Sequence, residues 1–511
     1  MAANSPHVFF SKESLTSVPW LMFSRLTTFF LYFGISIIIV RHLSKEDYGI
    51  YSLISGAAEY LMLLCNLGMN FSLLRFIPEL FSQRKITSLK RFLIKIIFVQ
   101  LLAIISLGLF LVLFNEKLSL SFHIDLWHYL PFLLFIVLTF VLKEFMNNAL
   151  TAIYLSKILA FFSLIQALAF LAFLTIWWWF NIFSVDMVIL AYGISILMVC
   201  AGSLYFFINK LNEVPCSGGR GVGKERLLKM SLPVMARNLI NKLMEQYGEI
   251  FFIAYFLTPV AVGYYSLGNM IPQLMITFIP LSLYSLFTAA FSEAYSKSAE
   301  ALPELIKGIF QILMIICLPI GFFGLFFSYP LVIGVYGSKM QPAAKLTAFF
   351  FGFKLLTLIW IPLGMAVAAK EKIANTLWID FFPLFIALPL DYMLIGNYGI
   401  SGALAAITIT FWLTLPVKLW WLKRILGGIY FPFSFFFRIG ISSFLVAGLF
   451  YLFFGEMSPW FLIPLAPCYS ILLVLVWKIL KLIHPSDVEM FKTVGIPKLN
   501  RWLDLMTHKN A

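Results

Sequence analysis

The chain has 511 residues, of which 61% are hydrophobic and only 12% are charged. Soluble domains carry roughly 25% charged residues, so this composition excludes a soluble globular protein and indicates apolar surface that faces lipid. The net charge is +14, but the basic residues lie in short segments between apolar runs, which is typical of membrane orientation rather than nucleic-acid binding. The five cysteines show no CxxC spacing and the six histidines are scattered, so we expect no metal site and no cofactor.

A membrane-spanning helix needs about 20 apolar residues. Segments of this kind run roughly through 17–41, 48–73, 92–114, 126–155, 158–182, 185–209, 229–257, 261–291, 304–328, 343–368, 373–395, 399–422, 433–455 and 459–481. The sequence therefore predicts an all-α membrane protein with about 14 transmembrane helices. The first residues lack the pattern of a cleavable signal peptide, so we expect the first helix itself to direct insertion.

Lysine and arginine are concentrated in one set of the predicted loops. The segments 84–91, 210–226 and 423–424 are rich in them, whereas the opposite loops hold few, such as Arg41 and Lys117. Because basic loops stay in the cytoplasm, we expect both termini to be cytoplasmic. The external connections are then all short.

A short pattern, G-x-Y-S-L, begins at Gly49 and again at Gly263, near the start of the second and the eighth predicted spans. It predicts two six-helix repeats in parallel orientation, which is a transporter architecture with the binding site between the halves. The expected organisation is an N-terminal six-helix half at 1–209, a cytoplasmic linker at 210–228, a C-terminal half at 229–425, two additional transmembrane helices at 426–481 and a cytoplasmic amphipathic tail at 482–511.

The seventh predicted span has an unusual polar face. Its polar residues are Arg237, Asn241, Glu245 and Glu249, which recur every four residues, and the adjacent Asn238, Lys242 and Gln246. A charge at the bilayer centre costs about 3 kcal/mol or more unless it meets a cavity or a partner. Two interpretations remain open. The face lines a cavity, or it forms a buried ion-pair network in which Lys242 bonds to Glu245 and Gln246.

Other predicted spans contain isolated polar residues: Arg25, Glu59, Lys143, Glu144, Asn147, Asn148, Lys354, Asp380, Asp391 and Arg438. Glu59 and Lys354 lie too far from the span ends to reach the headgroups. Arg438 is explained by extension of its side chain to the headgroups, and Asp391, near the outer end, is expected to be solvated.

Several segments resemble the bacterial polysaccharide exporters. These are Ile39 to Gly49, with its L-S-K-E-D-Y-G ending, Asn66-Leu67-Gly68, Val262-Gly263-Tyr264-Tyr265 and Tyr398-Gly-Ile-Ser-Gly-Ala-Leu-Ala405. Their order and spacing are similar to the oligosaccharide flippases of the multidrug, oligosaccharidyl-lipid and polysaccharide (MOP) exporter superfamily. The resemblance covers about 1–425. The sequence departs from it at Leu404, where the family often has alanine.

The resemblance implies two helical bundles around a cavity that opens alternately to each side of the bacterial cytoplasmic (inner) membrane. It implies a flippase, not an enzyme, that moves a polyprenyl-pyrophosphate-linked oligosaccharide, such as an O-antigen or capsule repeat unit, to the outer leaflet. A basic residue in the first span of relatives matches Arg25. The implied partners are membrane lipids, a coupling proton or sodium ion, and a polymerase or glycosyltransferases of the same polysaccharide biosynthesis pathway.

From these observations we expect two sets of site residues. The substrate-binding set is Arg25, Arg237, Lys242, Lys354 and Asn241, and the ion-coupling or charge-balancing set is Glu59, Glu245, Glu249 and Asp380. One alternative is a drug or metabolite exporter of the same fold, which would need a less cationic cavity. Another is a membrane polysaccharide polymerase, which would need a sizeable external loop. A structural scaffold would not need charges in mid-membrane.

Overall fold

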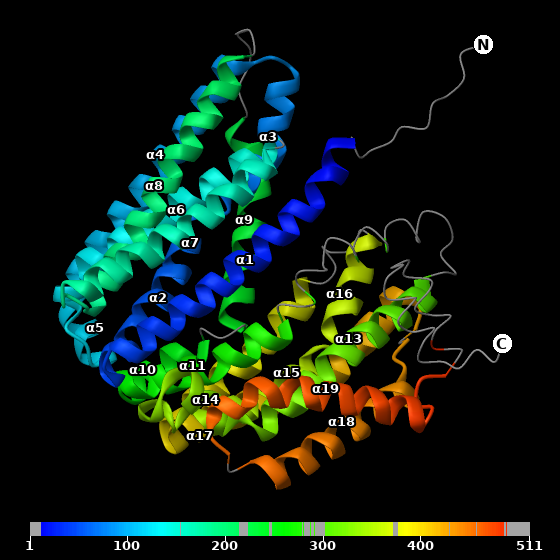
Figure 1. The fold of residues 1–511 in the computed structure, drawn as a ribbon. Coiled ribbons are helices and arrows are strands. Elements are labelled where there is room, and N and C mark those ends of the chain that lie inside the picture. The colour runs from blue at the N-terminus through cyan, green and yellow to red at the C-terminus, as the bar shows by residue number, and fades with distance from the viewer. Residues whose placement is uncertain are drawn as a thin grey trace, which may run out of the picture. The chain divides into compact units, whose positions relative to one another are not determined.

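A computed structural model of the chain describes residues 12–153, 155–213, 223–244, 248–277, 302–370, 377–428, 430–455 and 457–484, with the single residues 280, 287, 291 and 487 (Figure 1). Across these ranges the regular structure is helical and contains no strand, which confirms the all-α prediction. Ten described helices are long and apolar enough to cross a membrane, and Leu26–His42 is a shorter apolar segment. The count of about fourteen stays a prediction, since some expected spans run through residues outside the described ranges.

The chain divides into two compact units, Met1–Val260 and Ala261–Ala511. The first contains α1 (Lys12–His42), α2 (Lys45–Asn66), α3 (Met69–Ser82), α4 (Ile86–Leu113), α5 (Asn115–Phe122), α6 (Leu126–Ala152), α7 (Ser156–Trp179), α8 (Val185–Asn212), α9 (Lys224–Lys242) and α10 (Gly248–Phe256). Here α6 packs against α2, α3 and α8, and α7 packs between α1 and α8 (Figure 1). The helices α9 and α10, from the seventh expected span, contact α2 and belong to this unit.

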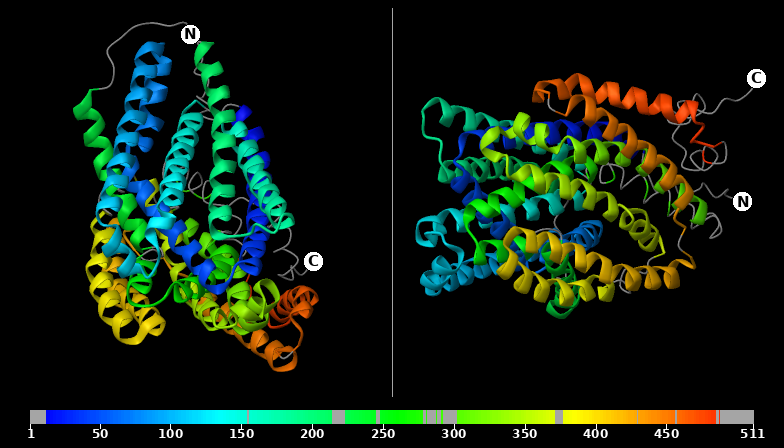
Figure 2. Two further views of the ribbon diagram at one scale, coloured as in Figure 1. Left: turned by 90° about the vertical axis from the view of Figure 1, so that its left-hand side faces the viewer. Right: turned by 90° about the horizontal axis from the view of Figure 1, so that it is seen from below.

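The second unit contains most of α11 (Pro259–Pro272), the π-helical turn Gln273–Thr277, α13 (Leu302–Phe326), α14 (Ser328–Tyr336), a 3-10 turn at Ser338–Met340, α15 (Ala343–Thr357), α16 (Trp360–Ala369), α17 (Leu377–Leu426), α18 (Phe433–Phe454), a 3-10 turn at Pro459–Phe461 and α19 (Leu462–Ile479). Its core is built on α13, which packs against α15 and α18. The orange α18 and the red α19 lie side by side (Figure 2).

The start of α2 follows from its sequence. Ser44 Oγ accepts a hydrogen bond from the Asp47 backbone N–H at 3.0 Å, which caps the helix, and Glu46 and Asp47 place negative charge in its first turn. The Gly49 and Gly263 copies of the repeated pattern lie at the same position after the starts of α2 and α11, at Lys45 and Pro259. The two copies therefore share local structure, while the division into six-helix halves stays a prediction.

The second expected span is broken where the sequence reads Asn66-Leu67-Gly68. Leu67 and Gly68 both adopt left-handed backbone angles, with φ of 49° and 68°, and they separate α2 from α3. A Cβ at Gly68 would lie 2.1 Å from the Ser231 carbonyl oxygen on α9. Glycine is therefore required both for the turn and for the close approach of α9.

Three buried amides fasten this break to α4. Gln100 Nε2 donates to Asn70 Oδ1 at 2.7 Å, and Asn70 Nδ2 donates to Asn66 Oδ1 at 3.0 Å. All three side chains are buried. Because the bilayer interior offers no water to such groups, they satisfy one another and hold α2, α3 and α4 together.

Candidate functional site

An ion pair joins two of the residues expected at the site. Lys242 Nζ on α9 donates to Glu59 Oε2 on α2 at 2.9 Å, across 183 residues of sequence. The side chains remain 28% and 37% exposed, so the pair is accessible rather than sealed in the helix packing. The local partners considered from the sequence, Glu245 and Gln246, lie outside the described residues.

Further polar side chains of the first unit gather near this pair. Lys143 Nζ on α6 lies 5.9 Å from the centre of the Tyr192 ring on α8, and the rings of Tyr32 and Tyr192 meet edge to face with centroids 6.4 Å apart. Glu144 Oε1 accepts a hydrogen bond from Asn148 Nδ2 at 3.0 Å. All five of these side chains are partly exposed.

The tyrosines were not anticipated from the sequence. Tyrosine is common where membrane proteins meet the interface, so its presence in a span carries little signal. The stronger signal was Lys143-Glu144-x-x-Asn147-Asn148, since residues four apart share a face of a helix. That pattern marks the polar face of α6, but the tyrosines reach it from α1 and α8, far away in the sequence.

The start of α9 is held by a second ion pair. The Arg226 guanidinium donates two parallel hydrogen bonds, of 2.8 and 2.9 Å, to the carboxylate of Glu79 on α3. It also lies over the Phe76 ring, 5.0 Å from its centre. These hydrogen bonds stabilise the ionised form of Glu79 and hold its pKa below the ordinary value. The contact is exposed and lies beyond the expected spans, so it anchors α9 rather than forming a binding site.

The remaining expected site residues are distributed over both units. Arg237 and Asn241 are partly exposed on α9, and Glu249 is buried on α10. Lys354 lies in the last turn of α15 in the second unit and is partly exposed. The side chains of Arg25, Glu245 and Asp380 lie outside the described residues. The complete set of nine therefore stays a prediction, of which the structure brings Lys242 and Glu59 together.

Two expectations about isolated charges were wrong. Arg438 does not simply extend to headgroups, because Arg438 Nη2 lies 3.2 Å from Asp487 Oδ2 in the segment after α19. Asp487 also accepts hydrogen bonds of 2.9 Å from Gln311 Nε2 and from the His484 backbone N–H. Asp391 is only 3% exposed and is not solvated. In both cases tertiary packing, which the local sequence does not reveal, determines the surroundings of the charge.

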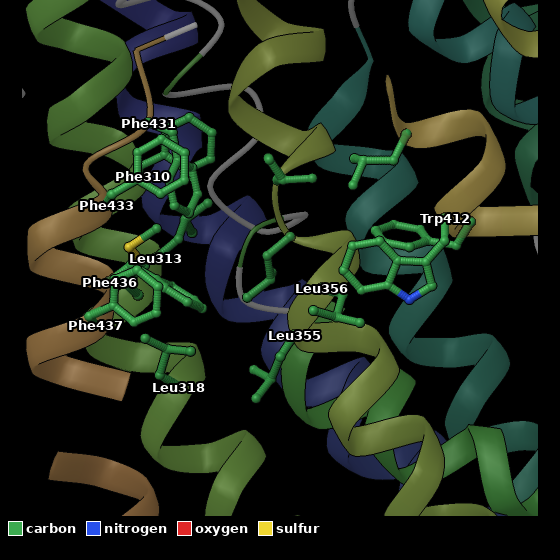
Figure 3. Close-up of a pocket in the computed structure, with 15 residues that line it drawn as sticks. Phe310, Leu313, Leu318, Leu355, Leu356, Trp412, Phe431, Phe433, Phe436 and Phe437 are labelled. Carbon is green, nitrogen blue, oxygen red and sulfur yellow. The ribbon is translucent and has the colours of Figure 1, made fainter. Parts of the chain in front are cut away.

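An apolar cavity of about 230 Å³ lies within the second unit (Figure 3). In Figure 3 aromatic and leucine side chains of α13 and α18 form one wall, and Leu356 of α15 and Trp412 of α17 face them. The lining residues are Phe310, Leu313, Met314, Leu318, Leu355, Leu356, Leu358, Ile359, Phe411, Trp412, Leu415, Phe431, Phe433, Phe436 and Phe437. No charged side chain is among them, so the cavity suits a hydrocarbon group rather than a polar one.

The two kinds of surface differ in what they can bind. The polar side chains of the first unit offer ammonium, hydroxyl and amide donors, whereas the cavity of the second unit offers only apolar contact. Among the described residues, no group of three or more histidine, cysteine, aspartate or glutamate side chains is placed to hold a metal ion.

Comparison with solved structures shows the fold. The chain is similar to a lipid II flippase, MurJ, in an inward closed conformation, with 13% identity and a TM-score of 0.70 over 90% of this chain and 99% of that one. It is also similar to an inward-facing multidrug resistance MATE family transporter of the MOP superfamily, with 14% identity and a TM-score of 0.62 over 78% of this chain and 94% of that one. A MOP superfamily transporter from Pyrococcus furiosus matches with 14% identity and a TM-score of 0.56, over 80% and 95% of the two chains.

A search of curated proteins found no significant match. The model of a family described as "Polysaccharide biosynthesis protein" matches residues 14–291, which is more than half of the chain. The solved structures above are transporters and flippases rather than enzymes. The chain therefore belongs to the polysaccharide biosynthesis protein family and is a multi-pass membrane protein with the fold of the MOP-superfamily transporters and flippases.

Proposed function

We propose that this protein is a flippase that moves a polyprenyl-pyrophosphate-linked oligosaccharide from the inner to the outer leaflet of the bacterial cytoplasmic membrane by alternating access. The observation that carries the proposal is the accessible, lysine-containing polar surface inside the first unit, formed around Lys242, Glu59 and Lys143. A transporter of purely apolar compounds would not need such groups in its spans, since each is costly in hydrocarbon.

The substrate has a head that cannot cross a bilayer unaided, because removing water from its charges and hydroxyls is prohibitive. Lysine and arginine side chains replace that water with charge-assisted hydrogen bonds to phosphate oxygens. The polyprenyl tail needs no such help, and the apolar cavity between α13, α15, α17 and α18 offers it aromatic and aliphatic contacts.

In this proposal Arg25, Arg237, Lys242, Lys354 and Asn241 hold the pyrophosphate and the first sugar. Glu59, Glu245, Glu249 and Asp380 balance their charge when no substrate is bound, and one of them takes up a coupling proton or sodium ion. Lys242 and Glu59 are direct partners in the structure, so a phosphate that binds Lys242 competes with this carboxylate. An arriving phosphate replaces the carboxylate as the partner of Lys242 and releases Glu59 to accept a cation.

The orientation follows from the distribution of lysine and arginine, with both termini in the cytoplasm. The substrate then enters from the leaflet where nucleotide sugars are available to glycosyltransferases. A polymerase of the same pathway would receive it on the other side. These enzymes are the protein partners that the proposal implies.

One observation favours a second candidate function. The cavity in Figure 3 is lined by aromatic rings and would also fit a lipophilic drug or metabolite, and the solved relatives include multidrug resistance transporters. An exporter of such compounds would use the same fold with a different ligand.

Purified protein reconstituted into liposomes tests the proposal directly. The liposomes contain a polyprenyl-pyrophosphate oligosaccharide, and a lectin added outside reports the exposed head group. We expect the protein to increase the exposed fraction and the Lys242→Met variant to do so at least about tenfold more slowly, since a charge-assisted bond of roughly 1.5–3 kcal/mol is lost. Transport of a lipophilic cation without any movement of the glycolipid would establish the exporter instead.

A further inference from the structure

Lys143 on α6 lies inside the helical bundle of the first unit. Unlike Lys242, it forms no ion pair with a described residue. It is partly exposed, and its ammonium group lies against the Tyr192 ring. No described carboxylate lies within ion-pair distance of it. The acids that act on its charge are Glu144, which accepts a hydrogen bond from Asn148, and Glu59, which is paired with Lys242.

This arrangement is costly for a membrane protein. Lys143 lies nine residues before the end of α6 at Ala152, which is roughly 14 Å along the helix axis. That distance exceeds the reach of a lysine side chain, so the charge cannot leave the bundle through the helix end. In membrane proteins an ammonium at such depth faces a cavity or a partner. Its retention needs an anion or water as a partner.

The surrounding groups can donate hydrogen bonds. Tyr32 and Tyr51 lie close to Tyr192 and offer further hydroxyl groups. Gln166 on α7 is only 3% exposed, and its side-chain nitrogen has no hydrogen-bond partner among the described residues. Its polar neighbour is the Tyr192 hydroxyl, which lies outside hydrogen-bond geometry. An acceptor placed beside Tyr192 would therefore receive donors from both Gln166 and Lys143.

We propose that Lys143 and Gln166, with the hydroxyl groups of Tyr32, Tyr51 and Tyr192, form an oxyanion site that binds a negatively charged oxygen of the translocated head group. The inference rests on the proposed function and adds a residue set that the sequence did not assign to binding. The ligand chemistry is a phosphate or a carboxylate, because each presents a negative charge and several acceptors to one ammonium and the neutral donors around it. The phosphate would belong to the lipid carrier, and the carboxylate to an acidic sugar.

Two probes distinguish these sources. Purified full-length protein in nanodiscs is titrated with inorganic pyrophosphate and, separately, with glucuronate, and binding is measured by calorimetry. We expect the Lys143→Met variant to bind at least about tenfold more weakly than the wild type. The Lys143→Arg variant keeps the charge and should retain part of the affinity. Lys95→Met, which removes an exposed lysine on α4, serves as the matched control and should bind like the wild type.

The probe that binds identifies the group that occupies the site. Pyrophosphate binding that depends on Lys143 assigns the site to the lipid carrier, and glucuronate binding that depends on Lys143 assigns it to an acidic sugar. Wild-type affinity for both probes in a folded Lys143→Met protein overturns the proposal, as does a wild-type protein that binds neither. Thermal unfolding of each variant verifies the fold, and Gln166→Leu provides a second variant that removes no charge and should weaken binding less.

The liposome assay separates this inference from the proposed function. A wild-type protein that binds an anion through Lys143 but moves no glycolipid supports the site and refutes the flippase. A wild-type protein that moves glycolipid, with full transport and unchanged anion binding in Lys143→Met, refutes the site and supports the flippase.

Discussion

Two ion pairs between described residues, Arg438–Asp487 and Lys242–Glu59, differ in how completely they are enclosed. In the second unit Asp487 is 6% exposed, and it accepts hydrogen bonds from Arg438, Gln311 and the His484 backbone. In the first unit the Lys242 and Glu59 side chains are 28% and 37% exposed. A buried carboxylate held by three protein donors leaves little room for a ligand, whereas an accessible pair can exchange its partners. The same chemistry therefore serves packing in one unit and is available for binding in the other.

The largest effect on stability is expected from removing one partner of the enclosed Arg438–Asp487 pair. Asp487→Ala leaves Arg438 and Gln311 without their acceptor, and removing one partner of a buried ion pair costs about 3–5 kcal/mol. The unfolding temperature of the detergent-solubilised protein should fall clearly. The matched control is Glu213→Ala, which removes an exposed partner of Lys210 and should change stability little. Equal effects of the two variants would show that the Arg438 contact is not an enclosed pair.

Substitutions in the accessible Lys242–Glu59 pair should reduce transport more than they reduce stability. Lys242→Met and Glu59→Gln should each reduce glycolipid movement by about tenfold or more, while the free energy of unfolding changes by about 1 kcal/mol or less. The double variant with Glu59→Lys and Lys242→Glu restores the pair with its charges exchanged. It should recover stability without transport, because the cation now lies on α2. Full transport by the double variant would refute a direct contact between Lys242 and the substrate.

The amide cluster around Gln100 is enclosed like the Asp487 pair but carries no charge, so its expected effect is smaller. Gln100→Leu removes the donor to Asn70 and should lower the free energy of unfolding by about 1 kcal/mol. Transport should persist at the temperature of the assay. Gln83→Leu, at an exposed glutamine bonded to Lys85, should be neutral. A neutral Gln100→Leu would mean that packing of α4 alone holds the α2–α3 break.

The smallest effect concerns the exposed Glu79–Arg226 pair and depends on pH. Its folded-state pKa is lowered from the ordinary value of 4.5, so the contribution is fully present above that value and is lost as pH falls through the lowered pKa. The wild type should melt slightly above Glu79→Gln at pH 7, and the difference should disappear in acid. A difference that is independent of pH would show that the carboxylate charge is not involved.

Much of the fold was predictable, because a helix in lipid must be long, apolar and complete in its hydrogen bonds. The expected start of the thirteenth span and the start of α18 both fall at residue 433. The interruptions were harder to predict. Gly399 has a φ of 61° inside α17, where two expected spans meet, and Leu67 adopts left-handed angles that a leucine rarely takes. Such breaks depend on neighbouring helices rather than on local preference.

The site was predictable in residue type but not in pairing. The polar face of the seventh span drew attention to Lys242, yet its partner Glu59 lies 183 residues earlier. The partner of Arg438 lies in the expected amphipathic tail, whose sequence does not indicate which of its residues contacts α18. Lys143 was noted only as an isolated charge, because the tyrosines beside it come from other helices. Long-range contacts of this kind follow from topology and cannot be deduced from spacing along one helix.

The anchoring of Asp487 has a practical consequence for handling the protein. A fluorescent reporter or affinity tag attached behind residue 487 leaves the acceptor for Arg438 in place, whereas a protease site or truncation introduced between Ile479 and Asp487 removes it. Shortened versions prepared for crystallisation or display would then lose the hydrogen bonds that hold the N-terminal end of α18 against α13. The useful boundary for engineering this chain therefore lies after Asp487 rather than at the end of its last transmembrane helix.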